Sequence, residues 1–118
     1  MAMHYELEVW KNSMKLTSKI YQLTNEFPRE EKYGLVQQLR RSVTSIPTNL
    51  AEGAARNYQK EFIQFAHISM GSLSEVETLM IVSSDIGLIT QDNEVFDEIR
   101  LLRIKLAGFI RHLKKSNS

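Results

Sequence analysis

The sequence has no cysteine and little glycine or proline. Without cysteine, the 118-residue chain can form no disulfide, and it has neither a thiolate nucleophile nor a cysteine ligand for zinc. Its 5 glycines and 2 prolines can build only a few turns, because these residue types most often interrupt regular structure. The elements must therefore be long, and the composition predicts an all-α chain with three connections.

The chain also lacks an excess of charge of one sign and a long run of apolar residues. The 15 Lys and Arg residues stand against 14 Asp and Glu residues, and the formal net charge of +1 exerts no general attraction on nucleic acid or anionic membranes. No stretch approaches the roughly 18 apolar residues of a membrane helix. The N-terminal sequence MAMHYELEVW lacks the basic start and apolar run of a signal peptide. We therefore expect a cytoplasmic protein that does not contact a membrane.

Four segments carry the apolar spacing of amphipathic helices. They cover residues 5–25, 31–54, 58–86 and 92–114. Phe27 before Pro28 ends the first segment, since a residue that precedes proline avoids the helical region, and Gly87 ends the third. Four long helices with short connections predict one domain, residues 1–118, folded as an antiparallel up-down-up-down four-helix bundle.

The first helix has two apolar stripes, whereas an ordinary surface helix has one. One interpretation is that neighbours in the same bundle cover both stripes, and the other is that one stripe faces a second subunit. On the fourth helix, Leu101 and Ile104 also lie off the main stripe and are a second indication of an apolar surface used elsewhere. The stripes of the first helix are Leu7, Trp10, Met14 and Tyr21 on one side and Val9, Leu16, Ile20 and Leu23 on the other.

Pro47 lies inside the apolar stripe of the second helix. It cannot donate to the carbonyl of Val43 and crowds it, which costs about 3 kcal/mol in a plain helix. Either one helix continues with a kink, which the unbroken phase of the stripe favours, or Ser45 caps a new helix near Pro47. In the corner that follows, we expect Gly53 near the helix end and Asn57 as the N-cap of the next helix.

No residue pattern typical of catalysis or metal binding is present. His4, His67 and His112 lie on different elements, and none has a partner at Glu-x-x-His or His-x-x-x-His spacing. Nucleophile elbows and phosphate-binding glycine loops are absent as well. We therefore predict a non-enzymatic protein without catalytic residues, cofactor or metal.

Glu77 is the most unusual charged residue, because it falls within the apolar arc of the third helix. An unpaired buried carboxylate is costly, so it needs a partner. Arg40, at the edge of the second helix's stripe, and Arg56, in the corner, could each bind a carboxylate through two N–H groups. We predict that Glu77 contacts an arginine of the region 40–56. A structural polar cluster would then contain Arg40, Glu52, Arg56 and Glu77.

Charge is distributed unevenly along the second half of the chain. Residues 61–98 include eight acidic residues and no Lys or Arg, whereas residues 99–118 include six basic residues and no acid. A basic ridge on the fourth helix could neutralise phosphates. Alternatively, it could be a solvated face whose residues pair with acidic residues of the third helix or of another subunit. No aromatic residues are interleaved with the ridge, so base stacking is not indicated. The candidate nucleic-acid-binding residues are Arg41, Arg100, Arg103, Arg111 and Lys114.

The stretch LVQQLRRSVTSIPTNLAEGAARNYQKEFIQFAHISMGSLSEVETLM, residues 35–80, carries the most distinctive motifs. They include Gln38-Leu39-Arg40-Arg41, Ser45-Ile46-Pro47 with Asn49, Ala51-Glu52-Gly53, Glu61-Phe62, and Gly71-Ser72-Leu73 followed by Glu75 and Glu77. With these motifs the chain resembles the bacterial four-helix-bundle family first noticed in open reading frames inside intervening sequences of 23S ribosomal RNA genes. It departs from that family at Ala54-Ala55, where a second glycine often follows Ala-Glu-Gly.

The resemblance implies a four-helix bundle that assembles as a homopentamer. The chain is also similar to the accessory proteins of diversity-generating retroelements, which are basic pentamers that bind nucleic acid and a reverse transcriptase. Most family members have no known function. We therefore expect a non-enzymatic oligomeric module that binds RNA, DNA or a nucleic-acid enzyme, or acts as a scaffold. The alternative is a protein–protein adaptor without nucleic-acid binding.

Overall fold

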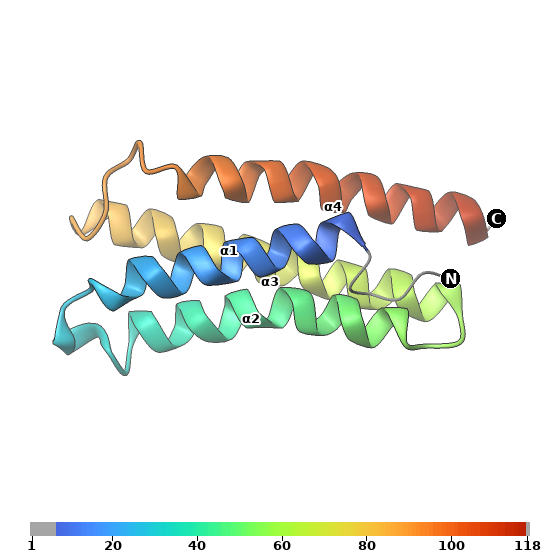
Figure 1. Cartoon of the computed structure of the whole chain (residues 1–118), viewed down its shortest axis with the longest axis horizontal. Helices are drawn as coiled ribbons and strands as arrows, with labels where there is room; N and C mark the ends of the chain where they lie inside the picture. Colours follow the sequence, from blue (N-terminus) through green and yellow to red (C-terminus); the bar gives the residue numbers. More distant parts are fainter. Residues whose placement is uncertain (1–6, 118) are drawn as a thin grey trace.

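The computed structural model describes residues 7–117, and this part of the chain contains helices and no strand. Figure 1 shows four long helices that lie side by side. They correspond to the four predicted segments, and a single 3-10 turn precedes the second. The elements are α1 (Glu8–Asn25), η2 (Arg29–Glu31), α2 (Leu35–Ala54), α3 (Gln59–Asp85) and α4 (Val95–Asn117).

Each helix packs against two others and not against the third. Helix α1 contacts α2 and α4, and α3 contacts the same two helices from the other side. The pairs α1–α3 and α2–α4 are therefore diagonal. The α1–α2 and α3–α4 connections lie at one end of the molecule, and the α2–α3 connection lies at the other end (Figure 1). This arrangement separates the outer face of α2 from that of α4.

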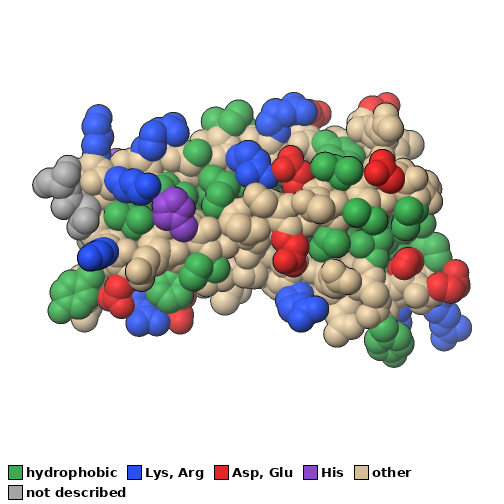
Figure 2. Space-filling model, turned by 180° about the vertical axis from the view of Figure 1, so that it is seen from behind, with side chains coloured by type: hydrophobic (Ala, Val, Ile, Leu, Met, Phe, Trp, Pro, Cys, Tyr) green, Lys and Arg blue, Asp and Glu red, His purple; other side chains and the backbone are tan. Residues whose placement is uncertain are grey.

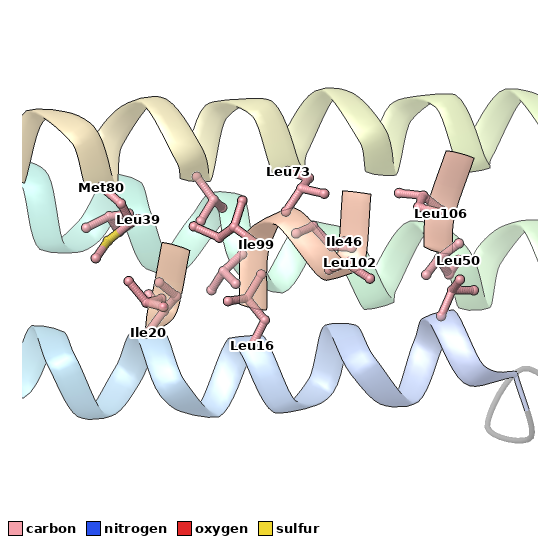
Figure 3. Close-up of a cluster of buried hydrophobic side chains, with 14 of the residues drawn as sticks. Leu16, Ile20, Leu39, Ile46, Leu50, Leu73, Met80, Ile99, Leu102 and Leu106 are labelled. Carbon is pink, nitrogen blue, oxygen red and sulfur yellow. The ribbon is translucent and has the colours of Figure 1, made fainter. Parts of the chain in front are cut away.

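One apolar stripe from each helix points into a common core (Figure 3). Leu and Ile side chains such as Leu16, Leu39 and Leu106 are at most 1% exposed. Burying each such side chain contributes about 1.5–3 kcal/mol. The core stripes are Val9, Leu16 and Ile20 of α1, Leu39, Val43, Ile46 and Leu50 of α2, Phe62, Leu73, Val76 and Met80 of α3, and Ile99, Leu102, Leu106 and Ile110 of α4.

Helix α2 runs through Pro47 without interruption. The prediction that one helix continues through Pro47 is thus correct, and the alternative of a new helix capped by Ser45 is wrong; the kink predicted with the continuous helix stays a prediction. The carbonyl of Val43 loses its usual donor because proline has no N–H group. A hydroxyl of the neighbouring helix approaches that oxygen, with Thr17 Oγ1 3.4 Å away. Packing of α1 on α2 therefore supplies a polar partner where the proline removes one.

The α2–α3 seam, formed by the facing sides of these two helices, combines small residues with interhelical hydrogen bonds. Buried Ser69 donates from Oγ to the carbonyl of Ile46 at 3.0 Å, and Ser72 donates to Ser45 Oγ at 2.9 Å. At Gly53, an added Cβ would lie 2.8 Å from Phe62 Cδ1 and 2.9 Å from Phe65 Cβ. The end of α2 therefore approaches α3 so closely that only glycine fits there without a shift.

Three helix starts among the described residues differ from the predictions. Helix α2 begins at Leu35, four residues later than predicted, because a 3-10 turn and a short connection precede it. Helix α3 begins after Tyr58, whose side chain makes no capping bond, so the prediction of Asn57 as N-cap is wrong. Helix α4 begins at Val95, three residues later than predicted, where Asn93 Oδ1 accepts the Val95 N–H at 2.9 Å. The end of α3 is as predicted, because Gly87 has a φ of +84°, which favours glycine.

The stripe of α1 that contains Trp10, Met14 and Tyr21 lies beside α2. Trp10 is half-buried there, whereas Met14 and Tyr21 keep 41% and 38% of their surface exposed. Neighbouring helices of the same chain therefore cover this stripe only in part. Leu101 and Ile104 of α4 are exposed too, at 48% and 61%. Exposed apolar surface thus occurs on more than one side of the molecule.

Candidate nucleic-acid interface

The basic ridge predicted for α4 is present on the outside of the helix. Figure 2 shows Lys and Arg side chains along the α4 edge of the molecule and near the end at which the chain terminates. The ridge residues lie three or eight positions apart, which places them on one face of a helix with 3.6 residues per turn. They are Arg100, Arg103, Arg111 and Lys114. Their surroundings divide them into two pairs.

Arg103 is held by α3. Its Nη2 donates to Glu77 Oε1 at 2.6 Å, and its Nη1 lies 3.2 Å from Ser74 Oγ. Both partners of the ion pair are partly exposed, with 33% and 39% of their side-chain surface accessible. Arg103 therefore joins α4 to α3, and little of its hydrogen-bonding capacity faces outward.

This ion pair corrects the prediction for Glu77. Its partner is Arg103 of α4, not an arginine of the region 40–56. Glu77 lies on the side of α3 that faces α4, whereas Arg40 lies on the side of α2 that faces α1. A helical projection places a residue on one side of its own helix, but it does not say which helix packs there.

Arg40 binds α1 instead of an acid. Its Nε donates to Thr24 Oγ1 at 3.1 Å, and its Nη2 donates to Asn25 Oδ1 at 3.0 Å and to the Tyr21 carbonyl at 3.4 Å. Its guanidinium carbon also lies 4.4 Å from the centre of the Tyr21 ring, which is a cation–π distance. Arg40 therefore fixes the end of α1 against α2.

Arg56 forms a separate group at the α2–α3 corner. Its guanidinium nitrogens lie 3.4 Å from Glu52 Oε1 and 3.6 Å from Glu61 Oε1. It also covers the ring of Phe65 at 5.0 Å. Arg40, Glu52, Arg56 and Glu77 were predicted as one polar cluster, but they belong to three separate contacts.

The remaining ridge cations differ in their access to anions. Arg100 pairs with Asp97 at 3.0 Å, one turn earlier on the same helix. Arg111 and Lys114 form no ion pair with an acidic side chain among residues 7–117. The Arg111 guanidinium extends across Gly108, where the missing side chain leaves room for it. Arg111 and Lys114 are therefore the ridge cations open to an external anion.

An open hollow of about 670 Å³ accompanies these two cations. Its described lining consists of Gly108, Arg111, His112, Lys114 and Lys115. No acidic side chain belongs to this lining, in agreement with the absence of Asp and Glu from residues 99–118. We name Arg111 and Lys114, which line this hollow, the α4 terminal cations.

Arg41 does not share a surface with the α4 ridge. It lies exposed on α2, which is diagonal to α4 and does not contact it. The five predicted residues therefore divide between two sides of the molecule. The second side is a groove between α1 and α2, and its described lining combines cations with tyrosines: Tyr21, Lys32, Tyr33, Val36, Gln37, Arg40, Arg41 and Thr44.

The sequence did not single out this groove. Its tyrosines come from α1 and from the α1–α2 connection, and its arginines come from α2. These residues are separated by up to 23 positions, from Tyr21 to Thr44, so no local spacing relates them. The pairing of α1 with α2 was predicted, but the position of Tyr33 in the connection was not.

The α1–α4 side contains the carboxylates with altered pKa values. Hydrogen bonding to Lys19 lowers the pKa of Glu94, and the same bond raises the pKa of Lys19. Burial raises the pKa of Glu98, and nearby Glu94 adds to this effect while Lys19 and Lys15 oppose it. Glu98 Oε2 is buried without a hydrogen-bond partner among the described residues. Its charge is therefore poorly compensated.

No group of three or more His, Asp or Glu side chains among residues 7–117 is arranged to hold a metal ion. None of the helices in the same range is long and apolar enough to cross a membrane.

Comparison with known proteins places the chain among helical proteins of unresolved role. The model of a family described as 23S rRNA-intervening sequence protein matches residues 5–110. A crystal structure of a protein with unknown function, from the S23 ribosomal protein family of Bacteroides thetaiotaomicron VPI-5482, matches with a TM-score of 0.79. The alignment covers 86% of this chain and 97% of that chain at 22% identity, which shows the fold alone. No curated protein matches.

Proposed function

The chain belongs to the 23S rRNA-intervening sequence protein family, and from this premise we propose that it is a non-enzymatic, self-associating four-helix bundle that binds nucleic-acid backbones. The helices run antiparallel in up-down-up-down order, as the alternating ends of the three connections support (Figure 1). We place this four-helix bundle in the cytoplasm.

Self-association is supported by exposed apolar side chains at Ile68 and Val82 of α3 and at Ile86, which directly follows the helix; we name them the exposed row on α3. They are 50%, 40% and 56% exposed, and their spacings of 14 and 4 residues place them on one side of the helix. A second copy of the chain is the proposed occupant, as a homopentamer by family resemblance. Light scattering of the purified chain tests this, because Val82→Ser with Ile86→Ser should lower the measured mass, and a monomeric parent would contradict it.

Nucleic-acid binding is carried by one observation: the α4 terminal cations have no acidic partner among the described residues. Phosphate oxygens are the complementary ligand, and each neutralised phosphate releases condensed counterions. The described lining of this hollow contains no Phe, Tyr or Trp, so we assign the contact to the phosphate backbone and not to base stacking. A duplex, whose phosphates face outward along a regular helix, is therefore the proposed ligand.

A mobility-shift assay with double-stranded RNA at low salt tests this function. The parent should retain the duplex, and Arg111→Gln with Lys114→Gln should lower the affinity by about tenfold or more. Lys11→Gln with Lys60→Gln removes the same charge from exposed positions outside the ridge and is the matched control. Absence of retention by the parent, or equal loss in both double variants, would refute the assignment.

A protein–protein adaptor is the second candidate, and the exposed row on α3 favours it. If Ile68, Val82 and Ile86 contact a different protein, the chain should be monomeric in light scattering and should not retain RNA at low salt. Binding of that protein would be insensitive to salt, because apolar burial does not depend on counterion release. Salt-sensitive RNA retention by an oligomeric chain would exclude this candidate.

A further inference from the structure

The groove between α1 and α2 opens at the end of the molecule where these helices are connected. It consists of a hollow of about 430 Å³ and an adjoining one of about 230 Å³. The two hollows share Lys32, Val36 and Arg40, so they form one continuous surface. In Figure 1 the α1–α2 connection lies at the opposite end from the terminus of α4, so this groove is separate from the α4 terminal cations.

All charged side chains that line the groove are cationic. They are Lys32, Arg40 and Arg41 in the larger hollow, with Arg29 added in the smaller one. None of the four forms an ion pair with a carboxylate among residues 7–117, although Glu26, Glu30 and Glu31 are near in sequence. The groove therefore offers positive charge that the described part of the chain does not neutralise.

Arg40 is preorganised to bind an anion. Its Nε and Nη2 groups are occupied by Thr24, Asn25 and the Tyr21 carbonyl, which fix the plane of the guanidinium. Its Nη1 group donates to no described residue, and Arg40 lines both hollows. A fixed arginine with one unused N–H pair loses little conformational entropy when it binds a phosphate.

Two tyrosines give the groove an aromatic surface. Tyr33 is 82% exposed, and the Lys32 ammonium lies 5.5 Å from the centre of its ring. Tyr21 is partly covered by Arg40 but remains 38% exposed. A planar ligand can therefore stack on Tyr33 while the cations of the same hollow contact its negative charge.

We propose that this groove binds a nucleotide unit, with the base against Tyr33 and the phosphate against Arg40, Arg41 and Lys32. Cations alone would accept any anion, and aromatic rings alone would accept any planar group. A nucleotide satisfies both because its phosphate is linked to a planar base. The unit can come from a free nucleotide or from a single strand, whereas the bases of a duplex are already stacked on each other and closed to Tyr33.

Isothermal titration of the purified full chain with AMP and with a hexamer of adenylate tests the proposal. Tyr33→Leu and Arg41→Gln should each weaken binding, by about tenfold for the loss of stacking. Both positions are exposed, so circular dichroism should show unchanged helicity. AMP binding as tight as hexamer binding would identify a free nucleotide as the source, and hexamer binding at least tenfold tighter would identify a strand.

Arg111→Gln with Lys114→Gln separates this site from the proposed function. That double variant should lose duplex retention and keep full affinity for AMP or the hexamer. The nucleotide site is overturned if neither probe binds the parent, if Tyr33→Leu and Arg41→Gln bind as the parent does, or if inorganic phosphate binds as tightly as AMP. None of these results would change the outcome of the duplex assay.

Discussion

The α2–α3 seam and the end of α4 use polar residues in opposite ways. In the seam, Ser69 and Ser72 donate to partners on α2, and Gly53 allows the helices to approach closely. At the end of α4, Arg111 and Lys114 have no acidic partner among residues 7–117, and the hollow beside them is open. The difference indicates that residues of the seam stabilise the fold, whereas the α4 terminal cations are available for a ligand.

We expect the largest change in stability at Gly53, and this change tests the structural role of the α2–α3 seam. An added methyl group would overlap Phe62 and Phe65, and overpacking of this kind costs about 1–3 kcal/mol. The higher helix propensity of alanine returns up to about 1 kcal/mol. Gly53→Ala should therefore lower the free energy of unfolding in urea by about 1–2 kcal/mol.

Gly71 provides the matched control for this substitution. It lies in α3, and a Cβ added there would meet nothing within 4 Å. Gly71→Ala should therefore stabilise the chain by up to about 1 kcal/mol through helix propensity alone. Equal stability of the two variants would show that α2 and α3 do not approach as closely at Gly53 as described.

The next effect concerns the half of the ridge that is joined to α3. Arg103→Gln removes the ion pair with Glu77, which is partly exposed, and should cost about 0.5–1 kcal/mol in urea unfolding. Arg100→Gln removes a more exposed pair with Asp97 and should cost about 0.3 kcal/mol or less. If both variants lose the same stability, Arg103 has no structural role that Arg100 lacks.

The smallest effect is a pH dependence at Glu98. Burial raises its pKa in the folded state, so the unfolding free energy falls as the pH rises from the unfolded pKa, and the loss is complete above the folded pKa. Glu98→Gln should therefore raise the unfolding free energy at pH 7 by up to about 0.5 kcal/mol. The gain should disappear below the carboxyl pKa of the unfolded chain, about 4.3. Thermal unfolding of both proteins at pH 4 and pH 7 measures this, and a pH-independent difference would contradict it.

Glu94 gives the opposite control. Hydrogen bonding to Lys19 lowers its pKa, so its contribution to stability is present above the unfolded pKa and is lost as the pH falls through the folded one. Glu94→Gln should therefore destabilise the chain at pH 7 and have no effect at the lowest pH. The two substitutions together show whether ionisation of Glu98 lowers the unfolding free energy while ionisation of Glu94 raises it.

Much of the fold, including the α2–α3 seam, could be predicted from the sequence. Apolar periodicity gave the four helices, and the unbroken phase through Pro47 correctly favoured one continuous helix. The motifs of residues 35–80 gave the family, which the matching family model confirms. Several of those motif residues, including Ser45 and Ser72, form the α2–α3 seam. Local patterns were sufficient here because neighbouring helices in the chain also pack together.

The failed prediction for the partner of Glu77 required knowledge of which helices face each other. Glu77 was placed correctly on its helix, but its partner was assigned to α2 and not to α4. Arg41 and the α4 ridge residues were predicted to bind nucleic acid, and the sequence did not show that they lie on diagonal helices. Tyr33 entered no prediction, because its role depends on the path of a connection that has no periodicity.

The salt dependence of duplex binding tests the central claim most directly. For double-stranded RNA, the logarithm of the association constant should fall linearly with the logarithm of the salt concentration. Removal of the α4 terminal cations by Arg111→Gln with Lys114→Gln should make this slope shallower by about 2, because each cation contributes about one unit. The unfolding free energy should change by no more than about 0.5 kcal/mol. An unchanged slope in the folded double variant would contradict the account.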